Sequence, residues 1–376
     1  MKISVLCSGF PTKKSAGSIF VVRLCEQWAD LGHEVSIVTP QSITKNILRN
    51  TGHTSKAFTH TTCKGHTINV YRPYIVSFSK MPLLKQLAVY LRRKAIANVI
   101  KKIGHQDAYY AHFWDNGYDL YKAAGKNATP LFVATGESVI HFRCDDERFR
   151  QNISGVVCVS SKNKEESISL HLTTKEKCMV IPNAIETTVF HKMDKLQCRR
   201  ELNIDTNLFV VIYVGQFLRR KGYDRLAAVI DRLNDPQIGV VFLGKAKEGK
   251  EPQCKGIIHR GFASQEIIAK YLNASDVFVL PTQAEGCCNA IVEAMACGLP
   301  IISSDLPFNY DILDSNNAVL IDPNNIEEIA AAIQKVRNDP ALKSSMSRNS
   351  LEKAKNLTLT MRAEKIIEFI KSSSKK

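Results

Sequence analysis

The 376-residue chain has no uninterrupted run of 18 apolar residues, so the sequence predicts no membrane-spanning helix. The run Met1–Leu6 enters a strand directly, is too short for a signal-peptide core and has no cleavage site after it. The eleven cysteines include no CxxC pair and no cysteine–histidine spacing typical of a metal site. We therefore expect a cytoplasmic protein with reduced, mostly buried thiols and no bound metal.

Two common phosphate-binding motifs are also missing. No GxGxxG follows the first strand, and no GxxxxGK[ST] occurs anywhere in the chain. These absences disfavour a dehydrogenase of the common dinucleotide-binding type and a P-loop ATPase.

Acidic residues are scarce in the first half. Residues 1–190 contain 25 lysines and arginines against 14 acidic residues, which accounts for +11 of the net charge of +15. Such a basic half predicts an anionic partner: a membrane surface, a nucleic acid or a charged glycan. Nucleic acid is disfavoured as the partner, because the basic residues are not interleaved with aromatic ones and the sequence contains no known nucleic-acid-binding motif.

The order of apolar runs predicts two α/β halves with parallel sheets, as the length also suggests. A hydrophobic content of 44% and a charged content of 23% are ordinary for a soluble globular protein. Helices are expected between the strands and over 325–373, interrupted at Asp339-Pro340, with a link between the halves near 185–198. The predicted strands are 2–8, 33–39, 108–111, 130–134, 156–159, 209–215, 239–243, 257–260, 277–280 and 300–303.

The segment 281–300, PTQAEGCCNAIVEAMACGLP, is the most informative part of the chain. It follows a buried strand and contains a nearly apolar helix, in which Asn289 and Glu293 share one face. A carboxylate on such a helix needs a partner, since burying it alone is costly. With Glu285 in the preceding loop and free N–H groups at the helix start, the pattern favours a nucleotide-sugar site. The alternative is that Glu293 pairs with a structural lysine or arginine.

Two other loops are weaker candidates for binding an anion. In 214–222, VGQFLRRKG, three cations follow a buried strand and could neutralise a diphosphate; the alternative is a solvated basic loop. Gly17 opens the first helix, where a missing side chain lets a phosphate or sugar approach, although most such glycines only shape a turn.

These motifs, in this order, resemble the GT4 family of retaining glycosyltransferases. The family's EX7E motif matches from Glu285 to Glu293, and its Lys-Gly element matches at Lys221-Gly222. Residues 182–186, PNAIE, stand where the family has the interdomain signature Pro-Asn-Gly-Ile-Asp, with Ala184 and Glu186 in place of Gly and Asp, and 32–35, GHEV, match an N-terminal pattern. The resemblance covers about residues 1–340, although 40–105 carry little of it.

The resemblance implies the GT-B fold, in which two Rossmann-like α/β/α domains face each other across a cleft. Residues 1–190 would form the acceptor-side domain and 191–355 the nucleotide-sugar-binding domain. Residues 356–376 would form a C-terminal helix that returns to the first domain. Closure of the two domains on the donor is expected.

The same resemblance implies roles for residues of the second domain. Glu285 would contact hydroxyls of the transferred sugar, Glu293 would bind the ribose, and Lys221 would stabilise the departing diphosphate. The family usually has an arginine where this chain has Gln216, so Arg219 or Arg220 would supply the missing charge, and Arg220 is our candidate. The remaining donor-binding candidates are Gly215, Phe262 in the base pocket, and Gly286, Cys287, Cys288 and Asn289, whose N–H groups would meet the diphosphate.

On the first domain, the resemblance places Gly17 and Ser18 near the diphosphate and His112 near the donor sugar and the acceptor. A single histidine after a strand is otherwise more often structural. The family needs no metal and no cofactor, and its donor substrate would be a UDP- or GDP-sugar. It is described as using front-face attack, in which the donor phosphate accepts the acceptor's proton. We find no second carboxylate placed to act as a nucleophile.

The acceptor is expected to be a glycan or a lipid-linked sugar in the synthesis of cell-surface polysaccharide or glycolipid. Residues 80–103 are basic and carry an apolar stripe at Leu84, Leu87, Leu91, Ala95 and Val99. Such a helix could lie on the inner face of the cell membrane, or it could be an ordinary helix with its stripe in the core.

Two further function classes stay open at this point. A GT-B nucleotide-sugar epimerase or a phosphorylase would bind a similar donor without the same acceptor. A non-enzymatic protein that binds sugar nucleotides or anionic polymers is disfavoured by the intact Glu285, Glu293 and Lys221.

Overall fold

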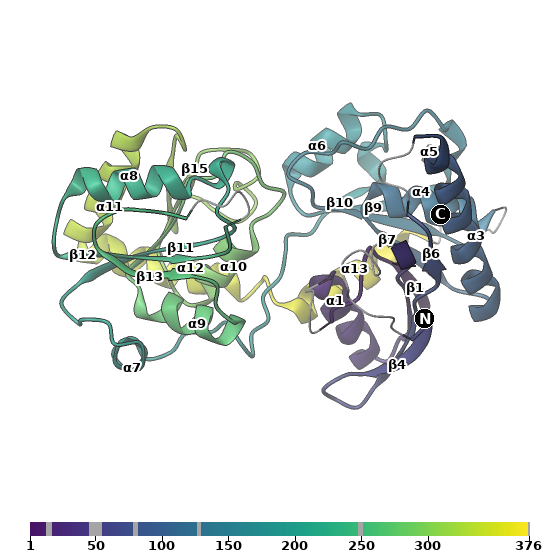
Figure 1. Cartoon of the computed structure of the whole chain (residues 1–376), viewed down its shortest axis with the longest axis horizontal. Helices are drawn as coiled ribbons and strands as arrows, with labels where there is room; N and C mark the ends of the chain where they lie inside the picture. The colour runs from purple at the N-terminus through teal and green to yellow at the C-terminus, as the bar shows by residue number, and fades with distance from the viewer. Residues whose placement is uncertain (13–16, 45–54, 78–81, 126–128, 247–250, 375–376) are drawn as a thin grey trace. The chain divides into compact units, whose positions relative to one another are not determined.

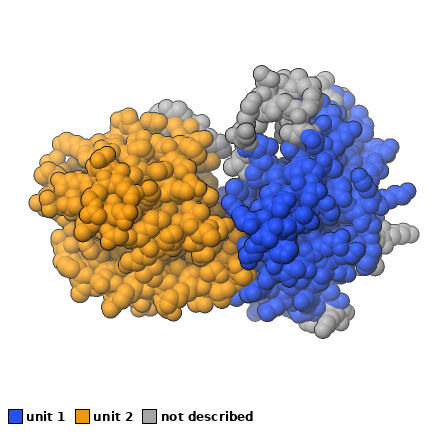
Figure 2. Space-filling view, turned by 90° about the horizontal axis from the view of Figure 1, so that it is seen from below, with its two compact units in different colours: residues 1–159, 163–181, 363–376 blue, residues 160–162, 182–362 orange. Residues whose placement is uncertain are grey.

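The structure is a computed structural model that describes residues 1–12, 17–44, 55–77, 82–125, 129–246 and 251–374. The chain forms two compact units, each with its own sheet and helices (Figure 1, Figure 2). The first unit contains Met1–Val159, Asn163–Ile181 and Ala363–Lys376, and the second contains Ser160–Lys162 and Pro182–Arg362.

The first unit is built on an eight-stranded sheet. Its order is β10-β9-β8-β7-β1-β2-β5-β4, and all neighbours are parallel except β4 and β5. The strands are β1 (Lys2–Leu6), β2 (Glu34–Val38), β4 (Ala57–Thr61), β5 (Thr67–Tyr71), β7 (Ala108–His112), β8 (Leu131–Thr135), β9 (Ile153–Cys158) and β10 (Cys178–Val180). A separate small pair joins β3 (Gln41–Ser42) to β6 (Tyr74–Ile75).

Helices accompany this sheet because the strands are buried on both faces and their connections must cross over. They are α1 (Ile19–Asp30), α3 (Pro82–Ile103), α4 (Trp114–Ala124), α5 (Glu147–Asn152), α6 (Ser161–Ser169), the 3₁₀ turn η1 (Lys175–Lys177) and α13 (Leu359–Ser373).

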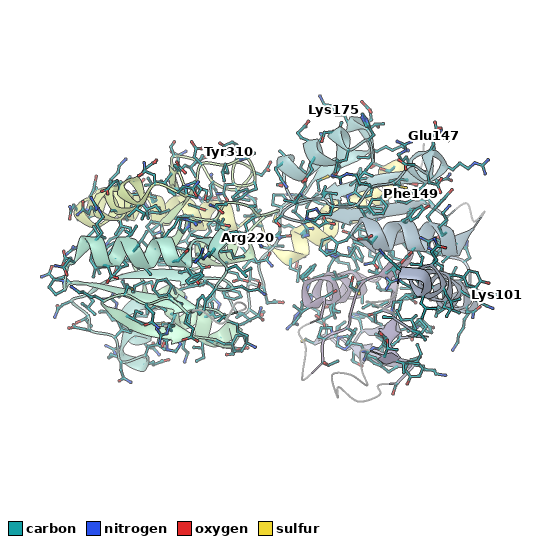
Figure 3. All side chains as sticks on the ribbon, turned by 45° about the horizontal axis from the view of Figure 1, so that its top comes forward. Lys101, Glu147, Phe149, Lys175, Arg220 and Tyr310 are labelled. Atoms are coloured by element: carbon teal, nitrogen blue, oxygen red, sulfur yellow. The ribbon has the colours of Figure 1, made fainter. Side chains whose placement is uncertain are left out.

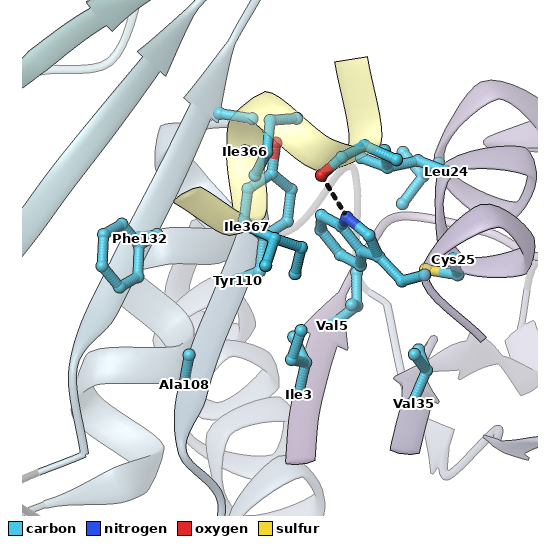
Figure 4. Close-up of a cluster of buried hydrophobic side chains, with 14 of the residues drawn as sticks. Ile3, Val5, Leu24, Cys25, Val35, Ala108, Tyr110, Phe132, Ile366 and Ile367 are labelled. Carbon is cyan, nitrogen blue, oxygen red and sulfur yellow. Dashed lines mark hydrogen bonds between the residues drawn. The ribbon is translucent and has the colours of Figure 1, made fainter. Parts of the chain in front are cut away.

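The end of the chain completes one core of the first unit. Ile366, Ile367 and Ile370 of α13 join a buried cluster with residues of β1, β7 and α1, part of which Figure 4 shows. Trp28 is fully buried there, and its indole Nε1 donates to the carbonyl of Ala363 at 3.1 Å. Residues 363–376 therefore fold with the first unit, although they follow the second in sequence.

The second unit has a six-stranded, all-parallel sheet in the order β13-β12-β11-β14-β15-β16. The strands are β11 (Phe209–Val214), β12 (Ile238–Leu243), β13 (Ile257–Gly261), β14 (Val277–Leu280), β15 (Ile301–Ser304) and β16 (Ala318–Ile321). Its other elements are α7 (Lys195–Glu201), η2 (Arg219–Lys221), α8 (Tyr223–Leu233), α9 (Gln265–Ala274), α10 (Asn289–Ala296), α11 (Ile326–Asn338) and α12 (Pro340–Ala354).

Each predicted strand overlaps an observed one, and Asp339 separates α11 from α12 as expected. The unit boundaries differ from the predicted ones: the chain leaves the first unit after Ile181 rather than at residue 190 and returns at Ala363 rather than at 356. Residues 182–190 belong to the second unit because Ile185 pairs with the segment before α13, through its N–H to the carbonyl of Leu357 at 2.8 Å.

The apolar stripe predicted for residues 80–103 is only partly buried. Within the described part of α3, the buried side chains are Ile96 and Ile100, while Leu87 is 47% exposed. The helix packs against α4, where Arg92 and Arg93 both pair with Asp119 at 2.7 and 2.9 Å. Val99 of the predicted stripe packs against the core beside Ile96 and Ile100, whereas Leu87 faces solvent.

Candidate active site

The loop after β14 holds Glu285 in a fixed place. Thr282 Oγ1 donates to Glu285 Oε1 at 3.2 Å, and Ser304 Oγ donates to the carbonyl of Thr282 at 2.5 Å. Fully buried Asn309 donates to the carbonyl of Ser304 at 2.8 Å. The end of β15 therefore positions the loop that carries the candidate sugar-binding carboxylate, a support that the sequence did not reveal.

Glu285 and Lys221 form a largely buried ion pair. Lys221 Nζ lies 2.9 Å from Glu285 Oε1, and the two side chains are 15% and 12% exposed. Burial lowers the pKa of Lys221, but the nearby Cys288 and Glu285 outweigh it and hold the pKa above its usual value. Lys221 is therefore a permanent cation, and loss of either partner would leave a buried charge uncompensated.

Arg220, labelled in Figure 3, is the arginine that reaches this pair. Its Nη1 lies 3.6 Å from Glu285 Oε1 and also donates to the carbonyl of Ala284. Arg219 is exposed, and its carbonyl accepts from the N–H of Gly222 at 3.0 Å. Gln216 is exposed as well, so Arg220 is the second cation of the site.

Glycines allow the loops after the strands to approach one another. Gly222 has φ of +76° between η2 and α8, and a Cβ there would lie 2.4 Å from the carbonyl oxygen of Pro281. A Cβ on Gly244, after β12, would lie 1.9 Å from the carbonyl oxygen of Gly215. Gly215 in turn lies next to Lys221, whose Cδ would be 3.4 Å from a Cβ at that position. Gly244 is a structural residue of this edge that sequence reasoning missed.

Glu293 is the unpaired carboxylate of α10. Its side chain is partly accessible but otherwise surrounded by protein, and burial raises its pKa to about 7. Within the described ranges, no charged or hydrogen-bonding side chain pairs with it. The structural alternative, a pair with a lysine or arginine, is therefore not what the structure shows, and the carboxyl is available to an external partner.

The start of α10 is suited to an anion. Gly286, Cys287 and Cys288 are buried, Asn289 is exposed, and no side chain caps this end of the helix. Burial raises the pKa values of Cys287 and Cys288 to about 11 and about 12, so both thiols are neutral. Asn183 Nδ2 donates to the carbonyl of Cys287 at 2.8 Å, which gives the Pro-Asn element a positioning role. The first-turn N–H groups of Ala290 and Ile291 face the Cys288 thiol, a weak acceptor, so an anion would be a stronger partner for this helix start.

Phe262 follows β13, the edge strand of the second unit. Its ring is 67% exposed, and Lys245 Nζ lies 3.8 Å from the ring centroid. Because β13, β12, β11 and β14 are parallel, Phe262, Lys221 and Glu285 all follow strands at the same edge of this sheet. An exposed aromatic ring at this edge is suited to stacking on a base.

The first unit carries the other candidates at the matching edge of its own sheet. His112 ends β7, and its ring lies 4.8 Å from that of Phe20 and 3.9 Å from that of Phe113. Gly17 has φ of +53° and packs on the backbone of Phe10, while Ser18 precedes α1 and donates its N–H to the carbonyl of Gly9 at 2.9 Å.

The turn at His112 is strained and braced. Phe113 has φ of +75°, which is rare for a bulky residue and typical of functional sites. Buried Asn116 holds the turn, since its Nδ2 donates to the carbonyl of His112 at 2.6 Å and its Oδ1 accepts from Arg92 at 2.7 Å. Arg92 of the basic helix therefore has a positioning role, which its sequence context did not indicate.

Glu137 is a further residue that sequence reasoning missed. It follows β8 beside β7, where Ala134 lies opposite His112. Its Oε2 accepts from Thr135 Oγ1 at 2.6 Å and from the N–H of Gly136 at 2.9 Å, and burial raises its pKa. The sequence feature that could have identified Glu137 is an acidic residue just after a buried apolar run.

The predicted site residues thus fall into two sets. Lys221, Arg220 and Glu285 are in direct contact, with Gly215, Phe262, Glu293 and the start of α10 around the same edge of the second sheet. His112, Gly17 and Ser18 lie in the first unit. In the described ranges, no three His, Cys, Asp or Glu side chains gather as a metal site would need, and no helix is long and apolar enough to cross a membrane.

A family model described as Glycosyl transferases group 1 matches residues 194–353, which is most of the second unit. A curated relative, the putative teichuronic acid biosynthesis glycosyltransferase TuaC of Bacillus subtilis, is 26% identical over 359 residues. The match covers 90% of each chain.

Solved structures share the fold over the whole length. Sucrose-phosphate synthase from Thermosynechococcus elongatus superposes with a TM-score of 0.79 at 18% identity, covering 99% of this chain and 98% of that chain. Anabaena HepE in complex with UDP has a TM-score of 0.74 at 18% identity and covers 99% of each chain. The predicted GT-B fold is confirmed by these likenesses.

Proposed function

We propose that this glycosyltransferase, which has the GT-B fold and whose second unit matches the Glycosyl transferases group 1 model, transfers a sugar from a nucleotide-diphosphate sugar with retention of anomeric configuration. The acceptor in this proposal is a glycan or a lipid-linked sugar of a cell-surface polysaccharide or glycolipid. The name of TuaC, a relative that matches along 90% of this chain, supports a polysaccharide.

The observation that carries the proposal is the contact between Lys221 and Glu285 at 2.9 Å, with Arg220 at 3.6 Å. Two cations and one carboxylate leave a surplus of positive charge next to the uncapped start of α10. A diphosphate fits this surplus, because a helix N-terminus and fixed cations both stabilise oxyanions. Glu285 would then accept hydrogen bonds from hydroxyls of the sugar.

The donor in this proposal is a UDP-sugar. HepE structures hold UDP, UDP with glucose, and UDP-glucose, and their likeness to this chain supports the same class of donor. In this chain Phe262 would stack on the base, Glu293 would accept hydrogen bonds from the ribose hydroxyls, and the diphosphate would meet Lys221 and the start of α10. The protein would need no cofactor and no metal, since Lys221, Arg220 and the helix start supply the positive charge.

The proposed reaction is front-face attack. The bond between the anomeric carbon and the leaving phosphate oxygen breaks while the acceptor oxygen bonds to the same face, and that phosphate oxygen takes the acceptor's proton. The site favours this route because it stabilises a departing diphosphate strongly. His112 and Glu137 are the first-unit groups proposed to meet the acceptor.

Contact with an anionic membrane at the cytoplasmic face remains part of the proposal. Lys85, Lys94, Lys101 and Lys102 are exposed along α3, and Figure 3 labels Lys101. Sedimentation with vesicles containing anionic lipid at low salt tests this contact, and an absence of binding would remove it from the proposal.

The function is tested by incubating the protein with UDP-sugars, alone and with oligosaccharide or polyprenyl-linked acceptors. We expect UDP release that depends on the acceptor and a product whose glycosidic bond keeps the donor's α configuration by NMR. Lys270→Ala is the matched control for Lys221→Ala, since Lys270 forms an exposed pair with Glu201. Conversion of UDP-sugar without any acceptor would favour an epimerase instead.

A further inference from the structure

The second unit contains a cavity of about 210 Å³ that the proposed donor site does not use. Asp276 directly precedes β14 and Pro300 directly precedes β15, and both line it. The two strands are parallel, so this cavity lies at the edge of the sheet opposite the Glu285 loop, which follows β14. The start of α12, at Pro340, completes the lining.

The charged residues of this lining are unbalanced. Lys192, Lys195 and Lys343 contribute three positive charges, and Asp276 contributes one negative charge. Buried Arg199 adds another cation next to Asp276. We call the hollow formed by these three lysines and Asp276 the lysine cavity.

Asp276 is already satisfied without the lysines. Its Oδ2 accepts from Arg199 Nη2 at 2.8 Å and from the N–H of Val210 at 2.8 Å. Both partners are buried, so a deeply placed carboxylate already has a charge-assisted bond and a backbone bond on that oxygen. Neutralising Asp276 therefore does not require Lys195 or Lys343.

The two lysines share the remaining oxygen of Asp276. Lys195 Nζ lies 2.5 Å and Lys343 Nζ 3.3 Å from Oδ1. Each ammonium group has three N–H donors, so most of their hydrogen-bonding capacity is left over. The side chains are 39% and 33% exposed, which leaves them accessible to an ion from solvent.

The local field reflects this crowding of positive charge. Burial lowers the pKa of Lys195, and the positive charges of Arg199 and Lys343 lower it further. The ion pair with Asp276 raises the pKa, but not enough to return it to the usual value for lysine. Burial raises the pKa of Asp276, but Lys195, the N–H of Val210 and Lys343 together hold it below the usual value. The nearby carboxylates Asp194 and Asp339 are committed to capping α7 and α12.

We propose that the lysine cavity binds a small phosphate-bearing anion at a site separate from the donor site. A phosphate dianion matches the surplus of two positive charges in the lining, and Lys is a point-charge ligand for phosphate. The lining also includes the start of α12, whose first turn is already capped by Asp339, so the lysines supply the binding groups. The volume exceeds that of a bare phosphate ion and leaves room for a small organic group such as a sugar.

The experiment measures phosphate binding while the donor site is filled. Protein saturated with UDP is titrated with inorganic phosphate at constant ionic strength, using calorimetry and thermal melting, with chloride as the reference ion. We expect saturable binding of one phosphate per chain and a melting temperature that rises with phosphate and not with chloride. Absence of saturable binding to the wild-type protein overturns the proposal.

Lys343→Gln is the decisive variant. It removes one cation of the cavity but leaves the buried ion pair between Arg199 and Asp276 intact, so the protein should still fold. We expect at least a tenfold weaker phosphate affinity with unchanged UDP affinity. Lys353→Gln is the matched control, since Lys353 lies on the same helix and pairs with Asp314 at 2.8 Å outside the cavity. Equal phosphate affinity in both variants would show that the bound phosphate lies elsewhere and would refute the assignment.

A second titration, with glucose 6-phosphate, distinguishes a phosphorylated metabolite from the free phosphate ion as the ligand of the cavity. Tighter binding than inorganic phosphate, lost in Lys343→Gln, assigns the cavity to a phosphorylated metabolite. Weaker binding assigns it to the free ion. UDP affinity, measured in parallel, distinguishes a failure of this inference from a failure of the proposed donor site.

Discussion

Glu293 offers the most direct test of the donor site, because its pKa of about 7 lies within the working range of most assays. We propose that the ionised carboxylate accepts hydrogen bonds from the ribose hydroxyls, so binding should favour the charged form and lower the pKa. Below pH 7 the carboxyl must lose a proton before it binds the ribose. Donor affinity is therefore expected to rise with pH and to level off above pH 7.

The expected change of the donor dissociation constant with pH follows from the pKa of Glu293. If the bound carboxyl returns to about its ordinary value, the free protein is almost fully ionised at pH 8 and about one-tenth ionised at pH 6. The dissociation constant should therefore be about tenfold larger at pH 6 than at pH 8, a difference of about 1.4 kcal/mol. In Glu293→Gln the dissociation constant should be larger overall and independent of pH over this range.

The assay is calorimetric titration with UDP-glucose at pH 6, 7 and 8. UDP-glucose is preferred to UDP, because the terminal phosphate of UDP itself titrates near neutral pH and would give a trend of the same sign. A flat profile in the wild-type protein would refute the role of Glu293, and so would an unchanged slope in Glu293→Gln. Glu293→Gln should also melt at a higher temperature than the wild type at pH 8 but not at pH 4, since the raised folded pKa destabilises only the ionised form.

Four further outcomes are expected. Lys221→Ala should reduce kcat by about 10²–10³-fold, because it removes a charge that stabilises the departing diphosphate, as measured by UDP release under saturating donor. Glu285→Ala should mainly reduce kcat, with UDP affinity changed less than by loss of Glu293, and an equal loss of UDP affinity would contradict the division of roles. Gly244→Ala should lower the free energy of unfolding by about 2–4 kcal/mol in urea melts, since its Cβ would overlap the Gly215 carbonyl; a neutral effect would disprove that contact. Glu137→Gln should raise the KM for the acceptor while leaving UDP affinity unchanged, and a loss of UDP affinity would argue against an acceptor role.

Much of the fold could be predicted because the central strands are buried on both faces. Runs such as 209–214 and 277–280 are wholly apolar, and a run of that kind is typical of a strand in a parallel sheet. The strands that were not predicted are the separate pair β3 and β6 and, toward the edges of the two large sheets, β4, β5, β10 and β16. They are shorter or mixed in polarity, since an edge strand buries less of its surface.

The helix α3 shows the limit of periodicity. Spacing alone predicted a stripe through Leu87 and Val99, yet the helix exposes Leu87 and buries Ile96 and Ile100, while Arg92 and Arg93 pair with Asp119 of α4. Apolar spacing on a long helix allows more than one face to be buried. The choice among them depends on the neighbour, which is distant in sequence.

The α/β class, the two halves and the candidate motifs at Lys221-Gly222 and Glu285–Glu293 could be read from the amino-acid sequence, because buried strands and the motifs at their ends are local features. The folded structure was needed to show that Arg220 rather than Arg219 reaches Glu285 and that Glu293 has no partner among the described residues. It also places Glu137 and Gly244 at the strand ends that carry the candidate sites. It also revealed the lysine cavity, whose residues come from α7, α12 and the starts of two strands. Charge contacts of this kind depend on distances across the fold, and neither spacing nor composition encodes a distance.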